Sequence, residues 1–415
     1  MRLRDFKTTS TRAASAMNVE TLTRIIMDKM PDIGKWQRDF MIHLMPLLLT
    51  IRGRHNFENL SRYGNFNEAT YRIRYEKDFD FLSFNKQLIR FLPKEERIIA
   101  FDPSYLPKSG KHTPGTSYFW SGCANATRYG LEISGFASVG VESRTAMHLF
   151  AKQTIGQEKY VSLLDYYASV VVDQADRLKA VSDILVADGY FWRRPFVDTV
   201  AQVDFTLISK LPSNAVLQYP CVGPRPKRRG RPSKYQGRVD RLHLDAAHFT
   251  PCLQEDHWTA YQGKVYVKAL DRLVKCVIIH ITKKDGSIRT EAVFATDPTM
   301  DGAKVLEYYR LRFQIEFLYR DAKQHTGLTE CQARSEQKIH THINASLTAV
   351  ALAKAVHCWP YTGQRRKVFS LSSIKTQYFN QHLLHRFFTE FGIAPETHQN
   401  SPQYQTLYSY GCIAA

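Results

Sequence analysis

The sequence predicts an α/β protein whose core is interrupted by a β-rich insertion and flanked by helical regions at both ends. Three observations lead to this fold class. Apolar runs and helical patterns alternate over residues 96–212, as in a mixed α/β sheet. Residues 213–300 contain mainly strand-like segments, and helical periodicity returns over residues 301–345. We therefore expect two separate stretches of the chain to build one core, followed by a C-terminal helical region over residues 346–415.

Residues 1–95 are expected to form a helical DNA-binding domain. The stretch "WQRDFMIHLMPLLL" has apolar residues at helical spacing, and Asn67 is a suitable N-cap for "NEATYRIRYEKDF". Basic and aromatic residues gather here, namely Arg62, Arg72, Arg74, Tyr63, Tyr71 and Tyr75. Two interpretations remain open: a helix-turn-helix-like reader of DNA, and a small helical bundle with solvated charges.

Two apolar runs in the core end in an acid. "RIIAFD" ends at Asp102 and "ILVAD" ends at Asp188, with a long amphipathic helix expected between them over residues 157–183. A carboxylate that ends a buried strand must be solvated, paired or bound to a metal ion. One such acid is usually structural, whereas two that are each followed by a loop suggest a site.

The stretch "DGAKVLEYYRLRFQIEFLYRDAKQHTGL" is predicted as one helix, over residues 302–326, with Gly327 as its stop. On an ideal helix, four polar side chains would share a stripe about 60° wide beside an apolar flank. These residues are Tyr309, Arg312, Glu316 and Lys323. Helix geometry alone also allows a solvent-facing surface with an Arg–Glu pair.

The insertion begins with a basic run. From Arg225 to Arg238 the chain has seven Lys or Arg residues and no acid. "RRGRP" contains the core of an AT-hook, whose arginines enter a narrow A·T minor groove; the alternative is a loop that follows phosphates without sequence preference. The candidate DNA-binding residues are Arg228, Arg229, Arg231 and Lys234. Strands are expected next at "LHLD", "KVYVKALDRLVKCVIIHITK" and "RTEAVFATD".

Composition limits the class of partner. The chain of 415 residues has 57 Lys and Arg against 39 Asp and Glu, a net charge of +18 that favours nucleic acid over membrane. No stretch approaches the roughly 20 continuous apolar residues of a membrane span. The seven scattered cysteines form no CxxC pair, which argues against a zinc site or a disulfide framework and predicts a cytoplasmic protein.

The spacing Tyr-x2-Arg-x3-Glu-x6-Lys in "YRLRFQIEFLYRDAK" resembles, without a gap, the signature of DDE transposases of bacterial insertion sequences. It is typical of the group of the fourth insertion sequence, which has a β-strand insertion. "FDPSYLPKSGK", "VADGYF", "ISKLPSNAVL" and "RRGRPSKY" fit the same family, so the resemblance covers roughly residues 35–345. One departure is "PSY" after Asp102, where many relatives have a small residue and Thr.

The resemblance implies a ribonuclease-H-like core with Asp102, Asp188 and Glu316 as both catalytic triad and metal ligands. Its cofactor would be two Mg²⁺ ions, for which Mn²⁺ can substitute, because hard cations take oxygen ligands and two of them serve both attacking and leaving oxygens. The phosphate-binding residues would be Tyr309, Arg312 and Lys323. The expected partners are double-stranded transposon ends and target DNA, bound by a homodimer and joined through 3′-OH ends.

Two alternatives remain. The first is a ribonuclease-H-like endonuclease that cuts DNA without strand transfer. The second is a non-catalytic DNA-binding protein that uses the basic run. The second predicts no constraint on the three acids, so the complete set of acids at the signature spacing counts against it.

Overall fold

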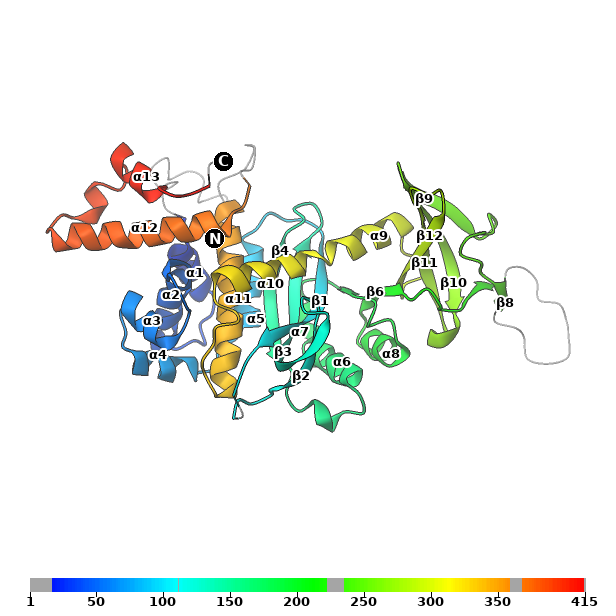
Figure 1. Cartoon of the computed structure of the whole chain (residues 1–415), viewed down its shortest axis with the longest axis horizontal. Helices are drawn as coiled ribbons and strands as arrows, with labels where there is room; N and C mark the ends of the chain where they lie inside the picture. Colours follow the sequence, from blue (N-terminus) through cyan, green and yellow to red (C-terminus); the bar gives the residue numbers. More distant parts are fainter. Residues whose placement is uncertain (1–16, 111, 222–234, 359–367, 414–415) are drawn as a thin grey trace.

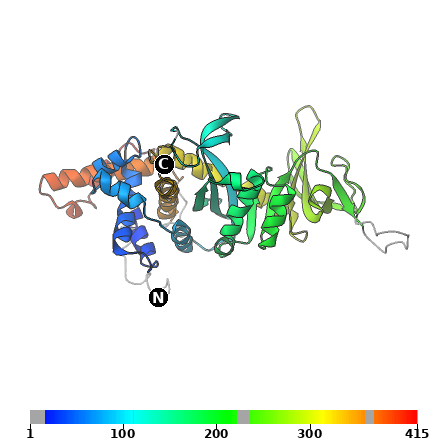
Figure 2. The ribbon, with the colours of Figure 1, turned by 90° about the horizontal axis from the view of Figure 1, so that it is seen from below.

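The computed structural model describes residues 17–110, 112–221, 235–358 and 368–413. The molecule is elongated, with helices gathered at one end and a group of β-strands at the other (Figure 1). The perpendicular view shows the same arrangement, with a sheet and its covering helices in the middle (Figure 2). The described part of the chain contains no helix long and apolar enough to cross a membrane.

Five short helices form the N-terminal part. They are α1 (Val19–Met27), α2 (Lys35–Thr50), α3 (Phe57–Tyr63), α4 (Glu68–Tyr75) and α5 (Phe81–Arg90). Four of the five begin at an Asn or Asp whose side chain accepts a backbone N–H inside the first turn. Asn67 is one of them, as the sequence predicted: its side chain accepts the N–H of Thr70. Each cap satisfies a donor that the helix itself leaves unpaired.

A mixed sheet forms the centre of the molecule. Its strands are β1 (Arg97–Pro107), β2 (Ser117–Ser121), β3 (Ala126–Gly140), β4 (Ala146–Gln153), β5 (Ile184–Ala187) and β6 (Thr206–Leu211). β1 pairs antiparallel with β3, and β3 pairs antiparallel with β4 and with β2. β5 lies parallel to β1 on its other edge, and β6 lies parallel to β5. The mixed α/β class predicted from the sequence is therefore confirmed.

Helices cover both faces of this sheet, and β1 shows why. Ile98 and Ala100 belong to one hydrophobic cluster, whereas Ile99 and Phe101 belong to the other, because successive strand side chains point to opposite faces. The first cluster includes α5 and two later helices, α10 (Gln314–His325) and α11 (Glu336–Cys358); the second includes the helices between β4 and β6. Those helices are α6 (Leu163–Asp173), α7 (Ala175–Lys179) and α8 (Arg194–Gln202).

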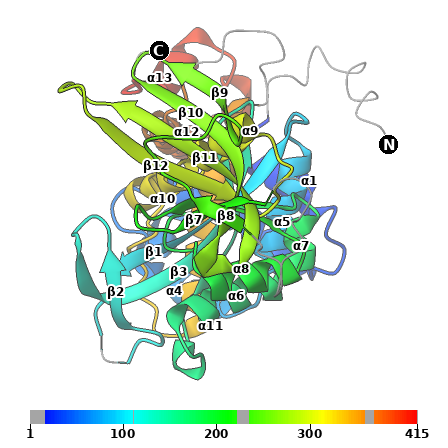
Figure 3. The same cartoon turned by 90° about the vertical axis from the view of Figure 1, so that its right-hand side faces the viewer.

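The outer strands, β7 to β12, extend the central sheet. They are β7 (Leu217–Pro220), β8 (Tyr235–Arg238), β9 (Phe249–Glu255), β10 (Trp258–Val267), β11 (Arg272–Thr282) and β12 (Ile288–Ala295). β12 pairs antiparallel with β6, so the order runs β2-β3-β1-β5-β6-β12-β11-β10-β7-β8, with β4 on β3 and β9 on β10. Figure 3 looks along the molecule, with the outer strands in front of β1 and β3.

The remaining helices follow β12. They are α9 (Gly302–Leu311), α10 (Gln314–His325), α11 (Glu336–Cys358), α12 (Leu371–Glu390) and α13 (Pro402–Tyr408). α11 is buried along most of its length between the N-terminal helices and β4. Gly327, just beyond α10, has a positive φ of 73°, as expected of a residue that stops a helix.

Two local expectations are wrong, and one strand was not expected. The single helix over residues 157–183 is instead a 3₁₀ turn (Gln157–Lys159) followed by α6 and α7, which are separated at Gln174. "LHLD" is not a strand: Asp240 accepts the N–H of Leu242 in a tight turn there. β9 was not expected, because its side chains are mostly exposed and lack the apolar alternation of a half-buried strand.

The expectation of a single helix over residues 302–326 is also wrong, because this stretch forms two helices, α9 and α10. Around the break, the N–H of Ile315 bonds to the carbonyl of Arg312 and that of Glu316 to Phe313, a three-residue spacing. α9 packs on β10, β11 and β12, whereas α10 packs on β1, β3 and β4. Sheets twist from strand to strand, and the break lets each helix follow the part of the sheet that it covers.

Candidate active site

The register of the sheet sets Asp102 beside Asp188. β1 and β5 pair in parallel through Ile99 with Leu185 up to Phe101 with Ala187. The next residue on each chain is an aspartate, and neighbouring strands lie about 4.8 Å apart. The expectation that the strand ends at Asp102 is wrong: β1 continues to Pro107, because β3 stays paired with it. Asp102 therefore lies within a strand, at the point where its parallel partner stops.

Asp188 lies in a turn that two hydrogen bonds hold. Its side-chain Oδ1 accepts the N–H of Tyr190 at 2.8 Å. Its main-chain oxygen accepts the hydroxyl of Ser209, on β6, at 2.6 Å. One bond closes the turn and the other ties it to the next strand, so the carboxylate stays near the end of β5.

Arg312 joins the other two acidic side chains. Its guanidinium lies 3.5 Å from Oδ1 of Asp102 and 3.2 Å from Oε1 of Glu316. The arginine side chain is only 14% exposed, and its buried Nε has no hydrogen-bond partner in the described part of the chain. Carboxylates from β1 and α10 thus meet at a single cation at the junction of α9 and α10.

The charge state of Asp102 reflects its neighbours. Burial raises the pKa of Asp102 to about 7; the Asp188 and Glu316 carboxylates act in the same direction, and Arg312 opposes them. A nearby positive charge stabilises the ionised form of a carboxyl group, and this stabilisation is largest where burial and other carboxylates oppose ionisation. The three predicted acids therefore form one electrostatically coupled group.

Tyr319 fixes α10 against β1. Its hydroxyl donates to the main-chain oxygen of Asp102 at 2.6 Å. The residue paired with Asp102 across the sheet is Gly135, where an added Cβ would lie 2.0 Å from the Tyr319 hydroxyl oxygen. Sequence reasoning did not single out Tyr319, since it falls between the signature positions; its only sequence signal is a tyrosine one turn after Glu316.

The other two signature side chains lie near the acids. The ammonium group of Lys323 donates to Oγ of Ser104 at 3.0 Å and to the main-chain oxygen of Tyr105 at 3.1 Å, and burial lowers its pKa. Burial also raises the pKa of Tyr309, which Arg312 lowers and Asp188 raises. The candidates of the basic run, namely Arg228, Arg229, Arg231 and Lys234, lie outside the described residues.

The chemistry of the donor set fits a hard divalent cation, since its members are carboxylates from β1, the end of β5 and α10. Within the described ranges, no three His, Cys, Asp or Glu side chains are arranged so that they could hold a metal ion as they stand. In this arrangement the Arg312 guanidinium engages Asp102 and Glu316. A cation at this point would compete with Arg312 for the same oxygens.

Comparison with known protein families identifies a family for this chain. The family model described as "Transposase DDE domain" matches residues 145–352, which is half of the chain. The matched region includes Asp188 and Glu316, whereas Asp102 precedes it. No curated protein matches the chain.

Proposed function

We propose, on the premise that this chain belongs to the transposase DDE domain family, that it cuts the ends of a mobile DNA element and joins them to target DNA. The family implies an enzyme that cuts and joins DNA. The finer steps are our proposal: hydrolysis at the inverted-repeat ends, followed by attack of the freed 3′-OH on target DNA.

One observation carries the assignment of the catalytic residues. Asp102 and Asp188 follow the last parallel pair of β1 and β5, and Arg312 contacts both Asp102 and Glu316. Three acids far apart in sequence therefore converge on one place. We assign Asp102, Asp188 and Glu316 as the catalytic triad and as the metal ligands.

The strand order supports a ribonuclease-H-like core. Three strands of the order β4-β3-β1 are antiparallel, and β5 and β6 continue the sheet parallel to β1. The outer strands stand between β6 and α9, which supports a β-rich insertion before the last core helices. Together with the Tyr-Arg-Glu-Lys spacing, this order supports our proposal that the chain belongs to the group of the fourth insertion sequence.

The proposed cofactor is a pair of Mg²⁺ ions, for which Mn²⁺ can substitute. When bound, such ions supply an activated water and stabilise the leaving oxygen. Asp102, Asp188 and Glu316 would hold them. Arg312, once its carboxylate partners are engaged by cations, is free to bind a phosphate through its planar fork of donors.

Lys323 and Tyr309 complete the proposed site. Lys323 is held beside β1 by Ser104 and Tyr105, so its charge is fixed near Asp102 without being a metal ligand. Tyr309 can donate a hydrogen bond to a phosphate or stack on a base. We propose that a homodimer binds two double-stranded ends.

The test uses duplexes of the DNA that borders this coding sequence. The protein is incubated with them and Mg²⁺, nicks are mapped, and joining of 3′-OH ends to a plasmid is measured. Cutting and joining are expected. Cutting without joining would identify an endonuclease, and binding without either would identify a non-catalytic DNA-binding protein.

A further inference from the structure

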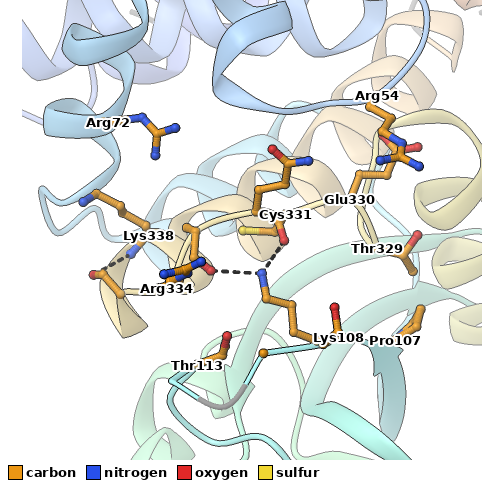
Figure 4. A pocket seen from close by; sticks show the side chains of 15 residues that line it. Arg54, Arg72, Pro107, Lys108, Thr113, Thr329, Glu330, Cys331, Arg334 and Lys338 are labelled. Atoms are coloured by element: carbon orange, nitrogen blue, oxygen red, sulfur yellow. Dashed lines mark hydrogen bonds between the residues drawn. The ribbon is translucent and has the colours of Figure 1, made fainter.

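A basic cleft lies between the N-terminal helices and the central sheet. It has a volume of about 1230 Å³ and is lined by the segment before α3, by α4, by the end of β1 and the residues after it, and by the connection between α10 and α11 with the start of α11 (Figure 4). Figure 4 shows the side chains of Arg54 and Arg72 on the opposite side of this space from Lys108. The cations that line it are Arg54, Arg72, Lys108, Arg334 and Lys338.

The single acid among these lining residues is already engaged. Glu330 accepts the main-chain N–H of His55 at 2.6 Å and lies 2.9 Å from the ring Nδ1 of the same residue. Burial acts to raise the pKa of Glu330, but the bonds from His55 outweigh it and lower the pKa. The carboxylate is therefore directed toward a buried partner, and the cleft keeps an excess of positive charge.

Two of the cations are available for a ligand. Arg54 and Arg334 are exposed, and neither side chain makes a hydrogen bond or ion pair within the described ranges. Arg72 pairs with Glu68 and Lys338 pairs with Glu76, both partly exposed. Exposed pairs of this kind contribute little to stability, so a phosphate can take over these cations at small cost.

Lys108 makes the floor of the cleft rigid. Its ammonium group donates to the main-chain oxygens of Cys331 and Ala333, the latter at 2.9 Å. These bonds tie the segment after β1 to the connection after α10. Because hydrogen bonds within the protein hold these two segments together, the cleft is already formed in the absence of a ligand.

The cleft lies at a defined spacing from Asp102. β1 carries Asp102 within its length and Pro107, a cleft residue, at its end. Five residues of strand span about 17 Å at a rise of about 3.3 Å per residue. α10 runs alongside, with Glu316 near its first residue and the cleft connection beyond its last. For a duplex whose axis runs along β1, this spacing corresponds to about five base pairs at about 3.4 Å per nucleotide step.

We propose that this cleft binds the phosphate backbone of duplex DNA about five base pairs from the phosphate that is cut. The inference rests on the proposed function, because it takes the position of the cut from Asp102. Guanidinium groups bind phosphate through two parallel N–H bonds, and the two unpaired arginines come from opposite walls. The N-terminal helices and the core thereby hold the same duplex.

The experiment measures binding in EDTA, so that no cutting occurs. Bordering duplexes are made with one neutral methylphosphonate at each successive position on both sides of the mapped cut. For the wild-type protein, substitution about five positions from the cut is expected to weaken binding several-fold. Arg54→Gln/Arg334→Gln should bind more weakly, should lose sensitivity to that methylphosphonate, and should flatten the slope of log K against log salt by about 1.8.

The matched control is Arg24→Gln/Arg90→Gln, which removes two exposed helical arginines outside the cleft. It should keep the wild-type sensitivity to the methylphosphonate. The inference is overturned if the methylphosphonate has no effect near that position, if both double variants behave alike, or if only single-stranded DNA binds. If the proposed function fails but this inference holds, Mg²⁺ would produce neither cutting nor joining. A methylphosphonate scan along the whole duplex in EDTA would still show one sensitive position, and Arg54→Gln/Arg334→Gln would lose that sensitivity.

Discussion

The hydroxyl of Tyr319 donates to the main-chain oxygen of Asp102 at 2.6 Å. This bond joins the helix that carries Glu316 to the strand that carries Asp102, and it does so one turn away from Glu316. The distance between the two proposed metal ligands therefore depends on a residue that is not itself a ligand.

Tyr319→Phe is expected to raise the Mg²⁺ concentration needed for half-maximal cutting and to slow cutting about tenfold at a fixed low concentration. The lost bond should cost about 1 kcal/mol of unfolding free energy. Tyr308→Phe is the matched control, because its hydroxyl bonds to Glu96 away from the acids. It should lose similar stability while its Mg²⁺ dependence stays that of the wild type. Equal Mg²⁺ dependence in both variants would assign Tyr319 a purely structural role.

Gly135→Ala should push α10 away from β1, because the new methyl group would lie 2.0 Å from the Tyr319 hydroxyl. Overpacking of this kind costs about 1–3 kcal/mol, and cutting should fall with it. Tyr319→Phe removes the nearest atom, so the double variant should be more stable than the sum of the two single losses predicts. Denaturant unfolding of all four proteins measures this coupling. Simple additivity would show that the two residues do not meet.

Asp102→Asn, Asp188→Asn and Glu316→Gln should each reduce cutting by on the order of a thousandfold, because an amide is a poor ligand for a hard cation. Binding to end DNA in EDTA should remain or tighten, since each change removes a negative charge. Gel shifts and nick mapping on the same samples separate the two effects.

The control for the acids is Glu307→Gln in α9, which lies outside the coupled group and should cut at the wild-type rate. Glu330→Gln is unsuitable as a neutral control, because its carboxylate is hydrogen-bonded to the buried His55. A variant at Glu316 that cuts normally would remove that residue from the triad.

Arg312→Gln should bind Mn²⁺ more tightly than the wild type in the absence of DNA, yet cut more slowly. The guanidinium is paired with oxygens of both Asp102 and Glu316. Its removal frees those oxygens for a metal ion and leaves the negative charge of the three acids less neutralised. Titration calorimetry with Mn²⁺ measures the first effect and single-turnover cutting the second. Weaker Mn²⁺ binding would mean that Arg312 organises the acids for the metal ions.

Stability should fall as the pH drops below about 6.5, because two buried histidines are kept neutral by the fold. Burial lowers the pKa of His148 to about 3 and that of His342 to about 4. In the unfolded chain, a histidine has a pKa of about 6.5. Below that pH the unfolded chain therefore binds more protons than the folded chain, and stability falls. At pH 5 each of the two histidines should lower the free energy of unfolding by about 2 kcal/mol relative to neutral pH, because one pKa unit corresponds to about 1.36 kcal/mol.

Urea unfolding at several pH values measures this loss. His148→Gln should show a shallower fall with pH than the wild type. An unchanged slope in His148→Gln would mean that the acid sensitivity arises elsewhere.

The sequence predicted the parts of the site that depend on local pattern. The apolar runs before Asp102 and Asp188 predicted two buried strands, and parallel pairing then aligned their ends. It did not predict Tyr319, because a hydrogen bond to the main chain of a distant strand leaves no periodicity. The split between α9 and α10 was also missed, since it follows from the two surfaces that these helices cover. The basic cleft was missed because three separate segments build it.

The pairing of β12 with β6 has a consequence for any shortened form of the protein. β6 has hydrogen-bonded neighbours on both sides, β5 within the centre and β12 beyond it. Deleting residues 213–300 would leave one long side of β6 with bare amide and carbonyl groups, a surface that recruits strands from other molecules. A trimmed chain should therefore precipitate as it folds. In the intact chain, β12 satisfies the hydrogen-bonding groups on this side of β6, so the outer strands leave no open edge there.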